Sequence, residues 1–131
     1  MSRKRLPRPT DSELAILRVL WERGPATVRS VNESLPGGAE PGYTTTLKLM
    51  QIMVDKGLLT RDDSTRSHVY TARVSRDQTQ RELVDDLLDR AFGGSASTLV
   101  MHALGASAAS PDELAAIQKL IDTYRRKEPR K

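Results

Sequence analysis

A series of helix-start and helix-stop signals divides this chain into short segments and constrains its fold more than any other feature. Thr10 and Glu13 have the spacing of a capping box, in which each side chain bonds the backbone N–H of the other residue. Gly24-Pro25 ends the helix that this box begins, and Thr27 is placed to cap the next one. The signals therefore predict a succession of short helices.

The next elements change from helical to extended patterns. The spacing of apolar residues predicts a third helix over about 43–56, which ends at Gly57. Two β-leaning runs follow, at 58–61 and 68–71, and the turn-rich segment between them predicts a β-hairpin. Three helices and a hairpin in this order are typical of a winged helix-turn-helix domain, which we expect over residues 1–75. The predicted fold class is mainly α with a small β-hairpin.

Residues 76–131 are expected to form a helical dimerisation domain. Capping boxes beginning at Ser75 and Ser110 predict the starts of its first and last helices. Short amphipathic helices enclose little core alone, so we expect their apolar stripes to pack against a second copy, as a homodimer. Packing onto the winged domain in a monomer is the alternative. The expected dimerisation residues are Leu83, Leu87, Leu88, Phe92, Leu99, Leu104, Leu114, Ile117 and Ile121.

The distribution of charge indicates a polyanionic partner for the first half. The chain has a formal net charge of +4; residues 1–75 carry twelve Lys and Arg against eight Asp and Glu, and residues 76–131 carry nine of each. A positive half joined to a neutral half favours a nucleic-acid-binding module with an appended domain.

The third predicted helix has the polar face that a helix needs to enter the major groove of DNA. Its expected core stripe consists of Leu47, Met50, Met53 and Val54. The opposite strip consists of Thr44, Lys48, Gln51 and Asp55, with Thr45 beside its start. Arg66 lies at the predicted hairpin tip, where a wing contacts DNA. We expect Thr44, Thr45, Lys48, Gln51 and Arg66 to bind DNA; an ordinary solvated helix face is the alternative.

The composition argues against several classes of site. Cysteine is absent, which excludes disulfides, thiol chemistry and cysteine-ligated metals, and the chain has only two histidines, His68 and His102. We see no acid–base pair and no phosphate-binding loop, so we expect no catalytic residue, no metal, no cofactor and no enzyme activity. No apolar run is long enough for a transmembrane helix or a signal peptide, so a cytoplasmic protein without membrane insertion is expected.

The order and spacing of several short motifs resemble the penicillinase-repressor family, the BlaI, MecI and CopY group of bacterial transcriptional regulators. The motifs are Thr10-Asp-Ser-Glu, Gly24-Pro-Ala-Thr-Val, Gly42-Tyr-Thr-Thr-Thr, Lys56-Gly-Leu-Leu, Arg66-Ser-His-Val-Tyr and Phe92-Gly-Gly-Ser. The resemblance implies a homodimeric repressor that binds inverted-repeat operators with TACA/TGTA-like half-sites. It also implies that Thr44, Thr45 and Lys48 contact bases and phosphates and that Arg66 is the wing contact.

The chain departs from this family pattern in three places. Ile52 stands where members often carry an arginine, and the cysteine pair of the copper-responsive branch is missing. Members that respond to β-lactams are cleaved between an asparagine and an aromatic residue, and Ala91-Phe92 occupies that place here. Release by a membrane-bound metalloprotease that cuts at Ala91-Phe92 is therefore a hypothesis.

Two functions from different classes follow from these patterns. The first is a sequence-specific repressor that occupies a pseudo-palindromic operator in double-stranded DNA and blocks transcription. The alternative is a winged-helix module that binds another protein and no DNA. Salt-dependent binding to a duplex distinguishes the two, because only neutralisation of phosphates releases counterions.

Overall fold

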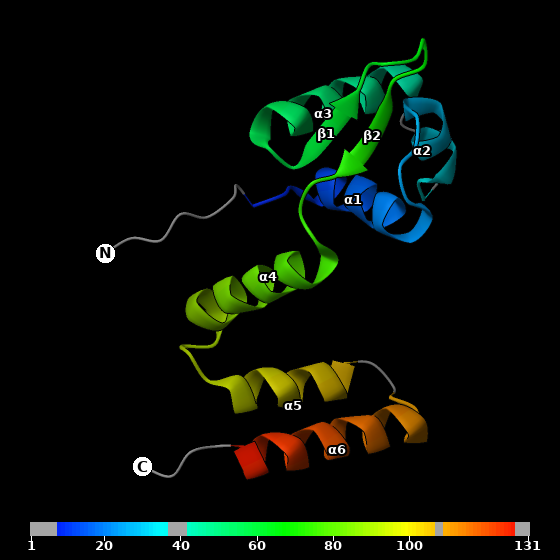
Figure 1. Ribbon diagram of the computed structural model, residues 1–131. Coiled ribbons are helices and arrows are strands. Elements are labelled where there is room, and N and C mark those ends of the chain that lie inside the picture. The colour runs from blue at the N-terminus through cyan, green and yellow to red at the C-terminus, as the bar shows by residue number, and fades with distance from the viewer. Residues whose placement is uncertain (1–7, 37–41, 107–108, 128–131) are drawn as a thin grey trace. The chain divides into compact units, whose positions relative to one another are not determined.

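The computed structural model describes residues 8–36, 42–106 and 109–127, which are mainly helical with one small antiparallel sheet (Figure 1). This confirms the predicted fold class. The chain forms two compact units, Met1–Val84 and Asp85–Lys131.

The first unit begins with three helices, α1 (Asp11–Arg23), α2 (Val28–Ser34) and α3 (Tyr43–Lys56). The capping box of α1 forms as predicted: the N–H of Glu13 donates to Thr10 Oγ1 at 3.2 Å, and the N–H of Thr10 donates to Glu13 Oε1 at 3.0 Å. The bounds of α3 also agree with the prediction. Gly57 ends this helix in the left-handed region, at φ +87°, which a residue with a side chain rarely adopts.

The wing consists of two antiparallel strands, β1 (Leu59–Asp62) and β2 (Val69–Ala72). Both strands lie one residue later than predicted. The reason is that the N–H of Leu58 donates to Met53 O at 2.9 Å and therefore still belongs to the end of α3. The segment between α1 and α2 adds a single antiparallel bridge to β2, between Ala26 and Tyr70.

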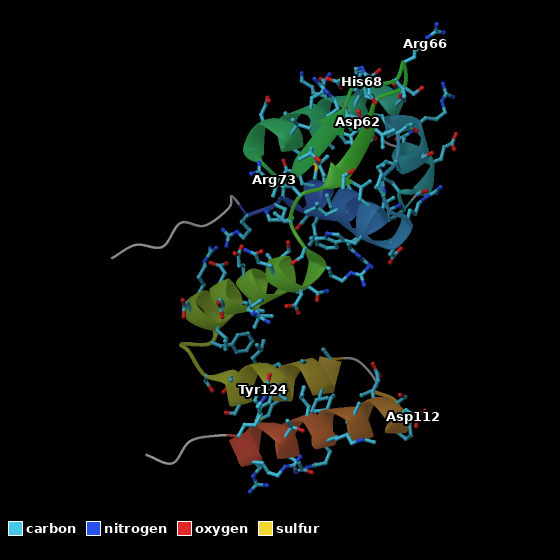
Figure 2. All side chains as sticks on the ribbon, viewed as in Figure 1. Asp62, Arg66, His68, Arg73, Asp112 and Tyr124 are labelled. Atoms are coloured by element: carbon cyan, nitrogen blue, oxygen red, sulfur yellow. The ribbon has the colours of Figure 1, made fainter. Side chains whose placement is uncertain are left out.

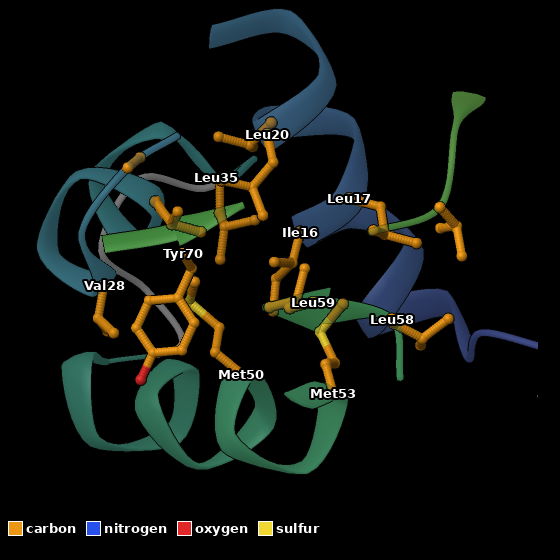
Figure 3. Packing of buried hydrophobic residues seen from close by; sticks show 14 residues of the cluster. Ile16, Leu17, Leu20, Val28, Leu35, Met50, Met53, Leu58, Leu59 and Tyr70 are labelled. Atoms are coloured by element: carbon orange, nitrogen blue, oxygen red, sulfur yellow. The ribbon is translucent and has the colours of Figure 1, made fainter. Parts of the chain in front are cut away.

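The core of the first unit lies between the three helices and the inner face of the hairpin (Figure 3). Met50 and Met53 of α3 are fully buried, as predicted, whereas Leu47 and Val54 are partly buried at its margin. The buried apolar residues are Ile16, Leu17, Val19, Leu20, Ala26, Val28, Val31, Leu35, Met50, Met53, Leu58, Leu59, Tyr70 and Val74. This packing fixes α3 and the wing on one scaffold.

Three further helices follow, α4 (Arg76–Ala91), α5 (Ala96–Ala106) and α6 (Pro111–Lys127). The box at Ser110 forms both of its bonds with Glu113, each at 3.0 Å. At Ser75, Oγ accepts from the N–H of Gln78 at 3.0 Å, but the Gln78 side chain donates to Glu82 instead of returning to the cap. The predicted reciprocal box at Ser75 is thus only half formed.

Candidate nucleic-acid interface

The polar strip of α3 lies on the surface of the first unit. The strip residues are all exposed: Thr44, Thr45, Lys48, Gln51 and Asp55. Helical geometry explains why α3 has one exposed and one buried side. Residues four and three positions apart share a side, and the buried side consists of Thr46, Met50 and Met53. The strip therefore offers hydroxyl, ammonium and amide groups to an external ligand.

The wing carries Arg66 at its exposed tip (Figure 2). The turn beneath it is shaped by two hydrogen bonds: the N–H of Ser64 donates to Asp62 Oδ1 at 2.9 Å, and Thr65 Oγ1 donates to Ser67 O at 2.6 Å. The Ser64 N–H bond lowers the pKa of Asp62. Arg66 makes no hydrogen bond or ion pair with the residues that the structure describes, so its guanidinium can contact a phosphate.

The end of the wing next to its turn carries further charged groups. Arg61 Nε lies 2.8 Å from Asp63 Oδ1, and His68 Nδ1 lies 3.6 Å from the same oxygen. A hydrogen bond with Tyr70 and the charge of Asp63 raise the pKa of Arg61. Arg61 therefore adds a permanent positive charge to the wing at neutral pH.

A groove with a volume of about 520 Å³ lies between the start of α2, α3 and the wing. It brings together two of the predicted DNA-binding residues, Gln51 and Arg66, whereas the other three lie elsewhere on the surface of α3. Sequence reasoning missed most of its lining. The lining residues are Thr27, Val28, Arg29, Tyr43, Leu47, Gln51, Arg61, Arg66, Ser67, His68 and Tyr70. No local sequence signal singled out Arg29, because its place in the groove depends on how α2 packs beside the wing.

A buried hydrogen bond holds α2 and α3 together beneath this surface. Thr46 Oγ1 donates to Asn32 Oδ1 at 2.7 Å, and both residues are almost completely inaccessible to solvent. Burying two polar side chains has a low free-energy cost only when they hydrogen-bond to each other. This bond therefore favours one relative position of the two helices. It thereby positions the exposed strip of α3.

The second surface of interest is the apolar face of the C-terminal helices. No residue of α5 or α6 that the structure describes is buried. Four of the predicted dimerisation residues are exposed, Leu87, Leu104, Leu114 and Ile121. The other five are partly buried, namely Leu83, Leu88, Phe92, Leu99 and Ile117. Five large apolar side chains outside that list of dimerisation residues are also exposed, and they are Val84, Val100, Met101, Leu120 and Tyr124.

The predicted cleavage position lies at the end of α4. Ala91 is the last residue of that helix and is exposed, and Phe92 is partly buried. The ring centroid of Phe92 lies 5.7 Å from that of His102. The turn that follows bends back on the helix, because the N–H of Gly94 donates to Leu88 O at 2.8 Å.

Within residues 8–36, 42–106 and 109–127, no three His, Cys, Asp or Glu residues are grouped closely enough to hold a metal ion. None of the helices described for this chain combines the length and the apolar character that crossing a bilayer requires.

Comparison with known proteins matches a family described as "Penicillinase repressor" to residues 9–123. A relative in Mycobacterium tuberculosis, named "Transcriptional regulator BlaI", is 33% identical over 100 residues, which cover 75% of this chain and 72% of the relative. A "Penicillinase repressor" of Bacillus licheniformis is 20% identical over 122 residues, which cover 93% of this chain and 95% of that protein.

Proposed function

Because the chain belongs to the penicillinase repressor family, we propose that it is a transcriptional repressor that binds an inverted-repeat DNA operator as a homodimer and blocks transcription there. In this proposal residues 1–75 bind DNA and residues 76–131 hold the dimer together. The observation that carries the proposal is the exposed polar strip of α3 beside a wing whose tip carries Arg66, which makes no hydrogen bond or ion pair with any described residue. The strip enters the major groove, and Arg66 contacts the adjacent backbone or minor groove.

Some side chains on this surface would position the protein on the DNA backbone, and others would recognise bases. Lys48 and Arg66 neutralise phosphates or donate to guanine, while Thr44 and Thr45 offer a hydroxyl and a methyl group that suit phosphate oxygen and thymine methyl. Gln51 can form a bidentate pair with adenine. Arg29 and Arg61, which line the neighbouring groove, add positive charge close to the same face.

The exposed apolar surface of the C-terminal helices supports the dimer. Leu114, Ile121 and Tyr124 of α6 are 47%, 44% and 64% exposed, respectively. Soluble monomers rarely leave so many large apolar side chains of one element in water. A second copy can cover them through a self-complementary two-fold interface. The dimer would then place two DNA-binding domains at a fixed separation on DNA.

Selection from a random duplex pool by the full chain tests this function. The expected result is enrichment of an inverted repeat. Affinity for the enriched duplex should fall about 10³- to 10⁵-fold between 50 and 200 mM salt, as for six to ten neutralised phosphates. Lys48→Ala should weaken binding and reduce the salt slope by about two, because the homodimer loses one phosphate contact from each copy.

Lys119→Ala is the matched control, since it removes an exposed lysine from α6 and should leave affinity unchanged. Negligible binding to any duplex, with no enriched sequence and no salt dependence, would instead favour the alternative, a protein–protein interaction module that binds no DNA. An unchanged dissociation constant in Lys48→Ala would refute the assignment of α3 as the recognition helix.

We also propose that the repressor is released by cleavage between Ala91 and Phe92, performed by a membrane-bound metalloprotease. The position of this bond supports the idea, because the end of a helix opens at lower free-energy cost than its middle. Co-expression with such a protease, followed by mass spectrometry of the fragments, tests it. Ala91→Asn should speed cleavage, and Phe92→Ser should slow it. An intact 91–92 bond after full activation of the protease would exclude this route.

A further inference from the structure

Trp21 of α1 bonds the short connection between the wing and α4. Its Nε1–H donates to Val74 O at 2.9 Å, a contact between residues 53 positions apart in the chain. Two further contacts hold the connection in place. The N–H of Arg73 donates to Leu58 O at 2.8 Å, and the Val74 side chain is buried in the core. The backbone that leads into α4 therefore has little freedom.

The same indole contacts the first turn of α4. The guanidinium of Arg76 lies 5.9 Å from the centroid of the Trp21 ring, within the range of a cation–π interaction. One turn later Thr79 is 5% exposed and is the only buried residue of α4. We use the term joint for Trp21, Val74, Arg76 and Thr79.

Beyond the joint, α4 and α1 are not closely packed. A hollow of about 270 Å³ lies between the two helices within the first unit. Its lining residues are Leu14, Arg18, Trp21 and Glu22 of α1 and Arg76, Gln80 and Leu83 of α4. The joint is therefore the main attachment of the start of α4 to α1.

We propose that Trp21 is a positioning residue that determines which spacing of half-sites the repressor accepts. This rests on the proposed function, a dimer that reads an inverted repeat. α4 has 16 residues and is therefore about 24 Å long. A rotation of about 10° at its first turn moves its far end by about 4 Å, close to the rise of about 3.4 Å for one base pair. A joint that is loose by this amount no longer distinguishes spacings that differ by one base pair.

The test uses the full chain and the duplex that the wild type selects from a random pool. The spacer between the half-sites is then lengthened and shortened by one and two base pairs, and each dissociation constant is measured by fluorescence anisotropy. Trp21→Phe keeps a ring beneath Arg76 but loses the N–H donor, and Arg76→Gln removes the cation from the ring. Both variants should reduce the preference for the selected spacing roughly two- to tenfold, the range of one hydrogen bond, with affinity for a single half-site unchanged.

Two controls separate positioning from general stability. Val19→Ala weakens the core of α1 outside the joint, and Arg81→Gln removes an exposed arginine of α4 that pairs only locally with Asp77. Neither should change the spacing preference. The proposal is overturned if Trp21→Phe retains the wild-type spacing profile, or if Val19→Ala flattens it equally. If the wild type selects no inverted repeat, the proposed function is overturned together with this inference. If the wild type and Trp21→Phe both bind an inverted repeat with the same strong preference for one spacing, only the inference is overturned.

Discussion

Three consecutive threonines at the start of α3 have different surroundings although they are chemically identical. Thr44 and Thr45 are exposed on the polar strip, whereas Thr46 is fully buried and donates to Asn32. Successive helical residues are rotated by about 100°, so a run of three cannot share one face. The same side chain thus serves recognition at two positions and packing at the third.

This difference predicts separate effects of Thr46→Val and Thr45→Val. Thr46→Val leaves Asn32 Oδ1 buried without its donor, so we expect it to lower the free energy of unfolding by about 1–3 kcal/mol. Thr45→Val changes an exposed side chain and should alter stability by less than about 0.5 kcal/mol while weakening DNA binding. Urea denaturation and anisotropy titration of both variants measure the two effects. Equal stability losses would contradict the assigned roles.

The ion pair between Glu13 and Lys56 predicts a loss of stability in acid. Glu13 is almost fully buried, and Lys56 Nζ lies 2.8 Å from its Oε2. Burial raises the pKa of Glu13, but the Lys56 ammonium and the N–H of Thr10 together lower it by more, so the pKa of Glu13 lies below the usual value for a glutamate. A carboxyl group with a lowered folded-state pKa stabilises the protein above its unfolded-state pKa. That stabilisation is lost as the pH falls through the folded-state pKa.

We therefore expect the free energy of unfolding to decrease as the pH falls below about 5, with a smaller decrease in Glu13→Gln. Lys56→Met should also reduce this pH dependence and should destabilise the protein at pH 7, because it leaves a buried carboxylate unpaired. Urea unfolding at a series of pH values measures both effects. Identical slopes in the wild type and Glu13→Gln would show that Glu13 does not contribute.

At the scale of elements, α3 is the helix on which the proposed function depends most. Ile52 is 40% exposed on its surface, one turn beyond Lys48, at the place where the family resemblance leads us to expect an arginine. An isoleucine there contributes no charge toward DNA.

Ile52→Arg should accordingly strengthen operator binding. Two additional phosphate contacts, one from each copy of the dimer, should steepen the dependence of log affinity on log salt by about 1.8. Ile52→Gln, a polar substitution without charge, is the control and should leave the slope unchanged. Anisotropy titrations at four salt concentrations compare the three proteins. A slope in Ile52→Arg equal to that of the wild type would place residue 52 outside the DNA contact.

The bounds of helices were predicted best from the sequence where a capping residue or a glycine marks the end of the element. The bounds of α3 agreed because Gly57 forces a left-handed backbone, and the start of α1 agreed because Thr10 and Glu13 can cap only one helix. Thr46 was missed because a search for apolar residues does not recognise a threonine whose hydroxyl finds a buried partner. The groove residues Arg29 and Tyr43 were missed because their proximity to the wing depends on tertiary packing, which no local pattern records.

At the scale of the whole molecule, the resemblance to the penicillinase repressor family is confirmed over most of the chain. The two units differ in how they bury apolar residues. The first has a continuous core of fourteen buried apolar residues, and the helices α5 and α6 have no buried residue among those described. Stability of the second unit is therefore expected to depend on association.

Ile121→Glu tests this dependence on association. A charge placed on the exposed apolar face of α6 should weaken the dimer by at least about tenfold, or about 1.4 kcal/mol. Lys119→Glu changes a neighbouring polar position of the same helix and serves as the control. Sedimentation velocity over a range of concentrations measures the monomer–dimer equilibrium. A wild type that remains monomeric at the highest concentration would contradict the dimer.

The bridge between Ala26 and Tyr70 has a consequence for the kinetics of DNA binding. Its two backbone bonds, 3.0 and 2.8 Å long, join the segment before α2 to the middle of the wing. The hairpin is therefore held in place before it contacts DNA, and it loses little conformational entropy when it binds. Encounter with a duplex should be a single fast phase governed by diffusion and charge attraction, with no slower rearrangement after it.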